Sequence, residues 1–280
     1  MAKCLFCQTS ETKTVFKEFG IDYLRCKKCG HLFSSFERNA HYDGYFENIE
    51  SESQAVEYWN ISHKKMYESF AKRFMKNGSG KILDIGAGLG FFVKFAQEKG
   101  WKSYGVEISK GGYKYAKEKL HLENFFCGKL EEMGFENESF DIITMWDVIE
   151  HLLEPRPILK KSAELLKKDG VLFLHTPNGE VQLIKSRLKK LFFGEKEGSH
   201  YLEAKDHLNL YKEATIKKLL YECGFKDIHF VHLPPIQSVA GKSDNLKVLV
   251  KNLWWLGAVL LNFLTFKQVN IDNVFVMAKK

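Results

Sequence analysis

The sequence predicts an α/β protein that carries a small cysteine-rich module at its N-terminus. Three observations support this prediction. Apolar strand-like segments alternate with helical ones from residue 81 onward, a glycine-rich turn follows the first such segment, and four cysteines lie within the first 29 residues. Short apolar strands separated by helices are typical of a mostly parallel sheet with helices on both faces.

The composition is that of a folded protein with a sizeable core. Of the 280 residues, 45% are apolar and 28% are charged, which excludes wholesale disorder. The net charge of +7 is below the charge density of a dedicated nucleic-acid-binding protein. No apolar leader segment follows Met1, so we expect a reducing, cytoplasmic location. The uncharged run 252–266 is shorter than the roughly 20 residues that span a bilayer, so we expect no transmembrane helix.

The elements of the main domain follow in order along the chain. Each strand is a short apolar segment, and each helix repeats its apolar residues at a spacing of three or four. We predict strands over residues 81–85, 103–106, 140–146, 170–175, 228–233 and 274–278. We predict helices over residues 91–99, 113–120, 158–167 and 215–223.

These elements suggest three segments. Residues 1–36 form the cysteine-rich module, and residues 37–78 form a helical linker or lid. A turn cluster at 77–80 marks the start of the main domain, residues 79–280. Two stretches of that domain break the α/β alternation and are expected to be insertions, at about 179–212 and 236–268.

The four N-terminal cysteines have the spacing of a metal site. Cys4, Cys7, Cys26 and Cys29 follow the pattern C-x2-C-x18-C-x2-C, in which each pair can turn two thiolates toward one point. Four thiolates satisfy tetrahedral Zn²⁺ and leave no open position for water, which predicts a zinc-ribbon-like module with a structural ion. Two disulfides or a redox motif are the alternatives. The missing export signal disfavours disulfides, and a redox motif needs no second pair.

A glycine-rich turn follows the first predicted strand of the main domain. Asp84 lies in that strand, and Gly86, Gly88 and Gly90 alternate at the start of the next helix. Glycines there allow a tight turn and a close approach of a ligand to main-chain N–H groups. The pattern also fits a dinucleotide site, but its third glycine comes one residue early. Glu107 ends the next strand, where a carboxylate can accept both hydroxyls of a ribose.

With these residues in place, the sequence resembles class I S-adenosylmethionine-dependent methyltransferases. The resemblance covers about residues 79–233 and the last strand, and it rests on LDIGAGLGFFVKFAQEKGWKSYGVEIS, FDIITMWDVIEHL and KKDGVLFLHTPN. It implies a Rossmann-like, seven-stranded, mostly parallel sheet. The branch that looks most similar comprises small-molecule, quinone-precursor and sugar methyltransferases. The cysteine module followed by HYDGYFEN also resembles, more loosely, zinc-carrying deoxysugar C-methyltransferases.

The resemblance implies roles for individual residues. The acid and glycines of the turn, Asp84, Gly86, Gly88 and Gly90, would hold the methionine part of S-adenosylmethionine, and Glu107 would hold its ribose. Leu130 would pack beside the adenine, whereas Lys129 stands where the family usually has an acid and cannot accept from the adenine amino group. Tyr42 and Tyr45 would close over the cofactor from the linker, with ordinary packing as the alternative.

The acceptor side is predicted from residues that follow two other strands. If a helix begins at Asp147, then Asp147, Glu150 and His151 share one face and could hold a proton or a divalent ion. His207 lies in the loop before the helix at 215–223, in a segment that commonly faces the acceptor in the family. We predict His207 or His151 as the base that takes the acceptor proton, with His207 favoured.

The predicted activity is methyl transfer to a small molecule or saccharide, including a nucleotide- or lipid-linked sugar. An RNA methyltransferase that uses the zinc module, or a binding protein that keeps the fold without catalysis, are the alternatives. The two apolar insertions are interpreted as a helical cap, a dimer seam or a basic amphipathic surface that contacts a membrane peripherally. Nucleic acid is not expected as a partner, because the module with its metal carries a net charge of only about +1.

Overall fold

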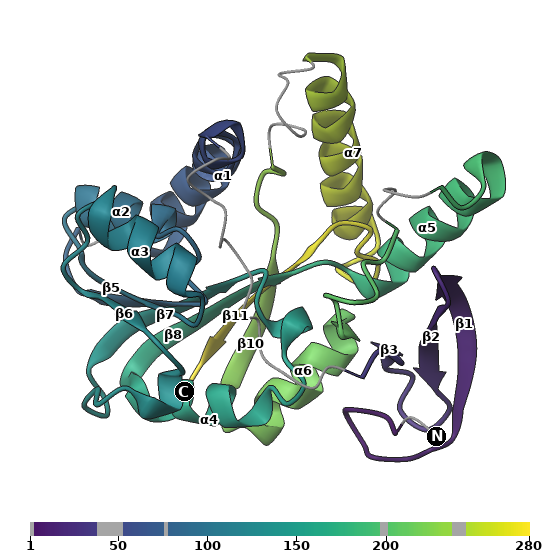
Figure 1. The fold of residues 1–280 in the computed structure, drawn as a ribbon, viewed down its shortest axis with the longest axis horizontal. Coiled ribbons are helices and arrows are strands. Elements are labelled where there is room, and N and C mark those ends of the chain that lie inside the picture. Colours follow the sequence, from purple (N-terminus) through teal and green to yellow (C-terminus); the bar gives the residue numbers. More distant parts are fainter. Residues whose placement is uncertain (1–2, 38–52, 76–77, 197–200, 237–244) are drawn as a thin grey trace.

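The computed structural model describes residues 3–37, 53–75, 78–196, 201–236 and 245–280, which fold around two sheets (Figure 1). The larger sheet has seven strands in the order β10-β11-β8-β7-β4-β5-β6. Its strands are β4 (Lys81–Ile85), β5 (Lys102–Glu107), β6 (Phe125–Cys127), β7 (Phe140–Trp146), β8 (Leu166–Thr176), β10 (Lys226–Val231) and β11 (Val274–Lys279). The predicted seven-stranded α/β fold is therefore confirmed.

One strand runs against the others. The pairs β4–β5, β4–β7, β5–β6 and β7–β8 are parallel, while β11 is antiparallel to both β8 and β10. The three-residue strand β6 was not among the predicted strands. β8 begins earlier than predicted, because Leu166 already pairs with Phe140 of β7.

Seven helices are described. They are α1 (Ser53–Phe74), α2 (Phe91–Glu98), α3 (Lys110–Glu118), α4 (Arg156–Leu165), α5 (Gly179–Phe193), α6 (Glu213–Glu222) and α7 (Asn245–Leu264). Among the described helices, none combines the length and apolarity that crossing a membrane requires.

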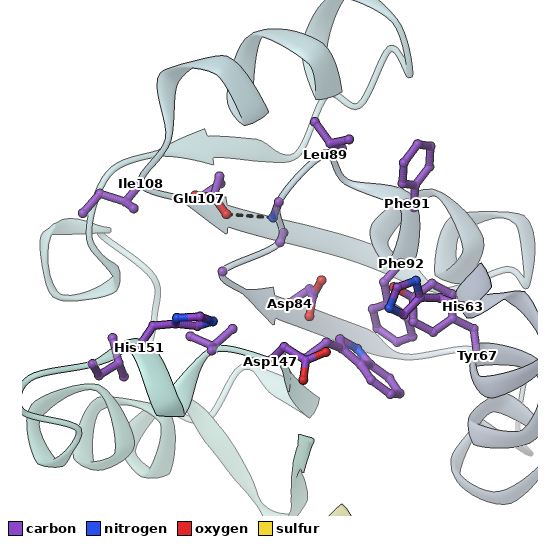
Figure 2. A pocket seen from close by; sticks show the side chains of 16 residues that line it. His63, Tyr67, Asp84, Leu89, Phe91, Phe92, Glu107, Ile108, Asp147 and His151 are labelled. Carbon is purple, nitrogen blue, oxygen red and sulfur yellow. Dashed lines mark hydrogen bonds between the residues drawn. The ribbon is translucent and has the colours of Figure 1, made fainter. Parts of the chain in front are cut away.

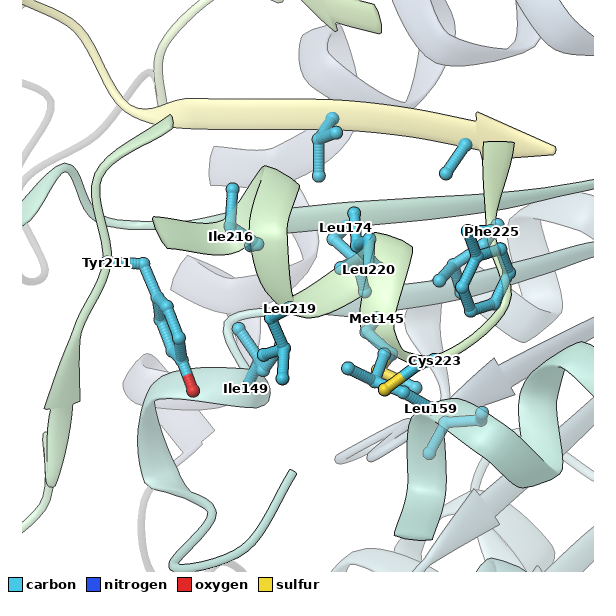
Figure 3. Packing of buried hydrophobic residues seen from close by; sticks show 14 of the residues in the cluster. Met145, Ile149, Leu159, Leu174, Tyr211, Ile216, Leu219, Leu220, Cys223 and Phe225 are labelled. Carbon is cyan, nitrogen blue, oxygen red and sulfur yellow. The ribbon is translucent and has the colours of Figure 1, made fainter. Parts of the chain in front are cut away.

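Both faces of the large sheet are buried, which explains why its strands read as continuous apolar runs. Ile142 of β7 packs in an aromatic layer under α1 and α2 that includes Phe70 and Phe92. The next residue, Ile143, points to the opposite layer, where α4 and α6 supply Leu159 and Leu219. Figure 3 shows this second layer, in which the side chains of α6 lie over the sheet. Side chains of β7 thus pack alternately into the two layers and hold the strand between them. The candidate site lies at the carboxyl end of this strand.

The N-terminal module is built on the smaller sheet. Its antiparallel strands are β1 (Thr12–Glu18), β2 (Ile21–Cys26), β3 (Leu32–Ser34) and β9 (Asn209–Leu210). The fourth strand, β9, comes from the loop between α5 and α6. The cysteine module therefore shares its sheet with a segment of the main domain that lies far away in sequence.

Candidate cofactor and acceptor site

A cavity opens beyond the carboxyl ends of β4, β5 and β7, where ligands bind in open α/β sheets (Figure 2). Six of the residues that the sequence pointed to line this cavity: Asp84, Gly86, Gly88, Glu107, Asp147 and His151. Figure 2 shows the side chains of Asp84 and Glu107 at the ends of neighbouring strands, on the same side of the cavity. A cationic or hydroxyl-bearing ligand would meet both carboxylates there.

The glycine turn brings the main chain close to the cavity. Gly86 and Gly88 have φ angles of 66° and 54°, a left-handed conformation that favours glycine. A Cβ atom on Gly86 would lie 2.6 Å from Cγ2 of Val148, so no larger residue fits beside the next turn. Gly90 is not among the lining residues, and its contact with the cofactor stays a prediction. A Cβ atom on it would lie 2.7 Å from Cδ1 of Leu122, and its absence lets α2 pack closely.

Glu107 is held in place by main-chain N–H groups. The N–H of Gly88 donates to Oε2 at 2.7 Å, and the N–H of Ser109 donates to Oε1 at 2.8 Å. Burial raises the pKa of Glu107, while these two hydrogen bonds oppose the rise. Each carboxylate oxygen has a second lone pair, so the side chain can also accept hydroxyl groups from a ligand.

Asp84 is buried at the base of the cavity. Burial raises the pKa of its carboxyl group to about 8, despite a hydrogen bond of 2.6 Å from Oγ1 of Thr144 to Oδ1. A carboxyl group with this pKa is mostly protonated at neutral pH. A cationic ligand beside it would restore the ionised form, because an opposite charge stabilises a carboxylate.

The wall formed by α1 was missed in the sequence. His63 and Tyr67 line the cavity one helical turn apart, and Tyr67 packs edge-on against Phe92 and Trp146. The signal was present, because His63 and Tyr67 precede Phe70 and Phe74 at the same spacing of three or four.

The segment after β7 differs from the prediction. No helix begins at Asp147, whose φ of 53° is left-handed, and a short 3-10 helix, η3 (Ile149–His151), follows instead. The acids Asp147 and Glu150 therefore point to different partners. Asp147 Oδ2 lies 3.1 Å from Nδ1 of His175, and Glu150 Oε2 accepts from Oγ1 of Thr176 at 2.9 Å.

The two acids consequently differ in the direction of their pKa shifts. Burial disfavours the charged form of Asp147, but the adjacent His175 outweighs it, so the pKa of Asp147 is lowered. Burial and the charge of Asp147 raise the pKa of Glu150 well above its usual value. The pKa values of the two acids are therefore shifted in opposite directions.

His151 and His207 meet at the edge of the cavity. Their ring centroids are 4.9 Å apart, although His207 is not itself among the lining residues. Nδ1 of His151 lies 3.0 Å from the carbonyl oxygen of Asp206. Because a carbonyl only accepts, Nδ1 carries the proton and Nε2 is the acceptor nitrogen of that ring.

Burial keeps both imidazoles neutral at pH 7. It lowers the pKa of His151 to about 4, with a contribution from the neighbouring His207, and it also lowers the pKa of His207.

Glu150, His151 and His207 together form a possible site for a divalent cation. Their ligand atoms lie within 4.8 Å of one another, and Oε1 of Glu150 is a buried oxygen without a hydrogen-bond partner among the described residues. These donors are of the kind that bind a divalent cation, so the alternative of a metal at this position fits the residues present.

The N-terminal module holds the loop that carries His207. The carboxylate of Glu18 accepts hydrogen bonds from the N–H groups of Tyr201, Leu202 and Ala204, at 3.1, 3.3 and 2.9 Å. The Tyr23 hydroxyl lies 2.8 Å from the carbonyl oxygen of Leu202 and 2.9 Å from that of His207. The module thus contacts five main-chain polar groups of this loop segment.

The four cysteines of the module converge as their spacing predicts. The Cys4 and Cys29 sulfurs are 3.6 Å apart, the Cys7 and Cys26 sulfurs are 3.5 Å apart, and all four lie within 4.8 Å of one another. A tetrahedral Zn²⁺ with bonds of about 2.3 Å separates its sulfurs by about 3.8 Å, so the cluster fits this ion. The cluster therefore agrees with a zinc-ribbon-like module.

Besides Gly90, three predicted cofactor contacts are not placed at the cavity. Leu130 is buried in the core layer below α4 and is not among the lining residues, whereas Ile108 lines the cavity after β5. Tyr42 and Tyr45 lie outside the described residues. The contacts of these three residues with the cofactor stay predictions.

The strand order, the glycine turn and the paired acids define the fold of class I methyltransferases. The chain belongs to the methyltransferase domain family, whose model matches residues 58–230. This match confirms the class expected from the sequence.

The chain is similar to two bacterial ubiquinone biosynthesis O-methyltransferases. It is 32% identical to that of Idiomarina loihiensis over 109 residues, which cover 36% of this chain and 44% of the relative. It is 28% identical to that of Vibrio parahaemolyticus over 168 residues, which cover 54% and 67%. The match therefore spans less than half of the first relative.

Solved structures share the fold at lower identity. A methyltransferase of Thermotoga maritima, described as a possible histamine N-methyltransferase, matches with a TM-score of 0.51 and 18% identity over 83% of this chain and 98% of its own. Phosphoethanolamine N-methyltransferase 2 of Haemonchus contortus matches with a TM-score of 0.50 and 16% identity, over 88% and 61%.

Proposed function

We propose that this protein transfers the methyl group of S-adenosylmethionine to a hydroxyl group of a small-molecule acceptor. The observation that carries the proposal is the pair Asp84 and Glu107, which lines one cavity together with the glycine turn. Family membership and these intact residues weigh against a binding protein without catalysis. The similarity to ubiquinone biosynthesis O-methyltransferases supports a quinone-precursor-like hydroxyl ahead of a saccharide.

The residues present fit the cofactor at both of its polar ends. Glu107 is anchored by two N–H groups and retains lone pairs for ribose hydroxyls, while Asp84 provides a carboxylate for a cationic amino-acid group. When bound, S-adenosylmethionine supplies a methyl group that is activated by positively charged sulfur. The apolar wall of Tyr67, Phe92 and Trp146 excludes water from this part of the cavity.

The acceptor proton needs a destination, and the histidine pair provides one. We favour His207 as the base, because the pKa of His151 at about 4 makes its imidazole a weak proton acceptor near neutral pH. The acceptor O–H bond would break as the proton moves to the imidazole. The oxygen would form its bond to the methyl carbon as the methyl–sulfur bond of the cofactor breaks, and the neutral thioether would leave. A divalent cation held by Glu150, His151 and His207 is the second candidate, supported by the orphaned oxygen of Glu150.

Calorimetric titration with S-adenosylmethionine tests the cofactor site directly. We expect Glu107→Gln to weaken binding by about 1–3 kcal/mol, because the amide replaces one acceptor oxygen by a donor that opposes the N–H of Gly88 or Ser109. Glu123→Gln, which changes an exposed acid outside the cavity, is the matched control. Equal affinities of the two variants would overturn the assignment of the ribose contact.

A further inference from the structure

Helix α7 turns an apolar face toward solvent. Its exposed side chains include Leu249, Leu253, Leu256, Leu260, Phe263 and Leu264, and Phe263 is 76% exposed. At 3.6 residues per turn these positions lie on one side of the helix. Among the described residues of α7, no charged side chain lies on that side, and the half-buried amide of Asn252 lies at its margin.

Two other polar side chains of α7, Lys251 and Asn262, point away from that side. Nζ of Lys251 donates to the carbonyl oxygen of Ile236 at 3.5 Å, and Nδ2 of Asn262 donates to that of Val269 at 3.0 Å. An ordinary surface helix has the opposite arrangement, with its apolar stripe on the core and its polar residues in water. The outward face of α7 is therefore expected to be more stable in contact with an apolar environment than with water.

Helix α5 extends this face. Ile184, Leu188, Leu191 and Phe192 are exposed along it, and Leu191 is 76% exposed. The two helices meet where Nζ of Lys185 lies 4.8 Å from the ring centroid of Trp254 on α7. We call the exposed apolar side chains of α5 and α7 the docking face.

The side chains along the docking face are mainly basic, although Glu195 pairs with Lys190 at 3.0 Å and Glu180, at the start of α5, pairs with Arg25. Residues 181–193 carry Lys185, Arg187, Lys189 and Lys190 without any acid, and residues 245–269 carry three lysines without any acid. An apolar face bordered by basic side chains matches the interface of a bilayer that contains anionic lipids. A second copy fits less well, because a two-fold dimer through this face would bring the same basic side chains together.

We propose that α5 and α7 dock the protein on the surface of an anionic lipid bilayer. The apolar side chains enter the boundary between headgroups and acyl chains, and the lysines contact lipid phosphates. The chain lies on the bilayer in this arrangement, in keeping with the absence of a spanning helix among the described residues.

The docking face is on the acceptor side of the sheet. α5 follows the carboxyl end of β8, and α7 connects the carboxyl end of β10 to β11, so both helices leave the edge at which the cavity opens (Figure 1). If the proposed function holds, an acceptor embedded in the bilayer can reach the cavity from this edge. That consequence rests on the proposed function, whereas the docking itself does not.

Co-sedimentation of the full chain with vesicles tests the proposal without cofactor or turnover. We expect binding to vesicles of phosphatidylcholine with a minority of phosphatidylglycerol, and much weaker binding to pure phosphatidylcholine or at high salt. Leu253→Glu combined with Leu260→Glu should lower the partition coefficient at least about tenfold, because two side chains lose their apolar contact with lipid. Tyr221→Glu, at an exposed residue on α6, should bind as the wild type does.

The second pair, Leu191→Glu with Phe192→Glu on α5, should lower the partition coefficient in the same way at independent positions. Thermal unfolding of each variant checks that it is folded. The proposal is overturned if the wild type does not sediment with anionic vesicles, or if both folded pairs sediment like the wild type. It is also overturned if the wild type is a dimer without vesicle affinity that Leu253→Glu with Leu260→Glu converts to monomers. The face would then be an interface between copies.

Discussion

The hydroxyl of Tyr23 lies 2.9 Å from the main-chain carbonyl oxygen of His207. Tyr23 belongs to the cysteine module, whereas His207 lies beside the cavity of the methyltransferase domain. The module is therefore in direct contact with the loop that carries our candidate base, and it can position this loop without touching a substrate.

Replacing Tyr23 tests whether this contact matters for turnover. Tyr23→Phe removes the single hydroxyl proton that the two carbonyl oxygens share, so we expect it to lower the free energy of unfolding by about 1–3 kcal/mol. We also expect a lower kcat with an unchanged affinity for S-adenosylmethionine, because the cofactor residues lie on other elements. Tyr221→Phe, at an exposed tyrosine, is the control. A kcat equal to that of the wild type in the folded Tyr23→Phe variant would show that the contact is structural only.

Removal of the metal from the cysteine cluster should lower kcat more than Tyr23→Phe does, because it affects the whole module. We expect one zinc per chain, and we expect Cys26→Ser to lose it and to disorder the module. Turnover should then fall more than cofactor affinity, since the module holds the loop of His207 and not the glycine turn. Metal analysis and calorimetry on Cys26→Ser and on Cys127→Ser, an exposed cysteine outside the cluster, would check this. Zinc-free wild-type protein, or four cysteines paired as disulfides, would contradict it.

Asp84 should release a proton when the cofactor binds. Its pKa of about 8 keeps the carboxyl group mostly protonated at pH 7, and a cationic ligand favours its ionised form. Calorimetry at pH 7 in two buffers of different ionisation enthalpy should therefore report a release of roughly one proton per site. Asp84→Asn should bind more weakly and release none. A wild-type enthalpy that does not depend on the buffer would mean that Asp84 is already ionised or remains protonated.

The same pKa has a consequence for stability. The pKa of Asp84 is raised above its unfolded value, so its contribution to stability is fully present below about pH 4 and is lost as the pH rises through about 8. The cofactor-free wild type should thus lose stability relative to Asp84→Asn between these pH values. Thermal unfolding of both proteins across this range measures the difference.

The histidine pair can be separated by substitution and pH. Losing the general base should lower kcat roughly 10²–10⁴-fold, and we expect this for His207→Ala with cofactor affinity preserved. Because burial lowers the pKa of His207, the acid limb of the pH–kcat profile should lie below pH 6.5. His229→Ala, at an exposed histidine of β10, is the control.

Near-normal turnover of both His207→Ala and His151→Ala would remove the histidine base from the mechanism. If turnover instead depends on an added divalent cation and is abolished by a chelator while the cysteine cluster keeps its zinc, the metal alternative replaces it. Zinc analysis of the chelated protein distinguishes the two metal sites.

Much of the large sheet could be predicted because its strands are unambiguous in the sequence. Lys81–Ile85 and Phe140–Trp146 are short apolar runs bordered by turns, and burial on both faces is what makes them continuous. β6 and β9 have three and two residues, too few to show a period. Their existence depends on the strands beside them.

Some residues of the candidate site could likewise be predicted from local sequence, and others depend on contacts between distant segments. The glycines and the acids Asp84 and Glu107 are adjacent to strand ends, so local sequence is enough to bring them together. The left-handed conformation of Asp147 cannot be inferred from its residue type, and it replaced the expected helix by η3. The contact of His207 with the module depends on the pairing of β9 with β3, a relationship between residues more than 170 positions apart.

That pairing also constrains how the chain folds during synthesis. Leu32 pairs with Leu210, and Phe33 pairs with Asn209, so the first three strands of the protein lack their fourth partner until most of the chain has left the ribosome. Contacts of such long sequence separation form late, because closing the intervening loop costs entropy before the pairing is gained. Until then β3 presents an unpaired edge, which is prone to pair with other chains. Early zinc capture by Cys4, Cys7, Cys26 and Cys29 would hold the nascent hairpin in a defined shape through this interval.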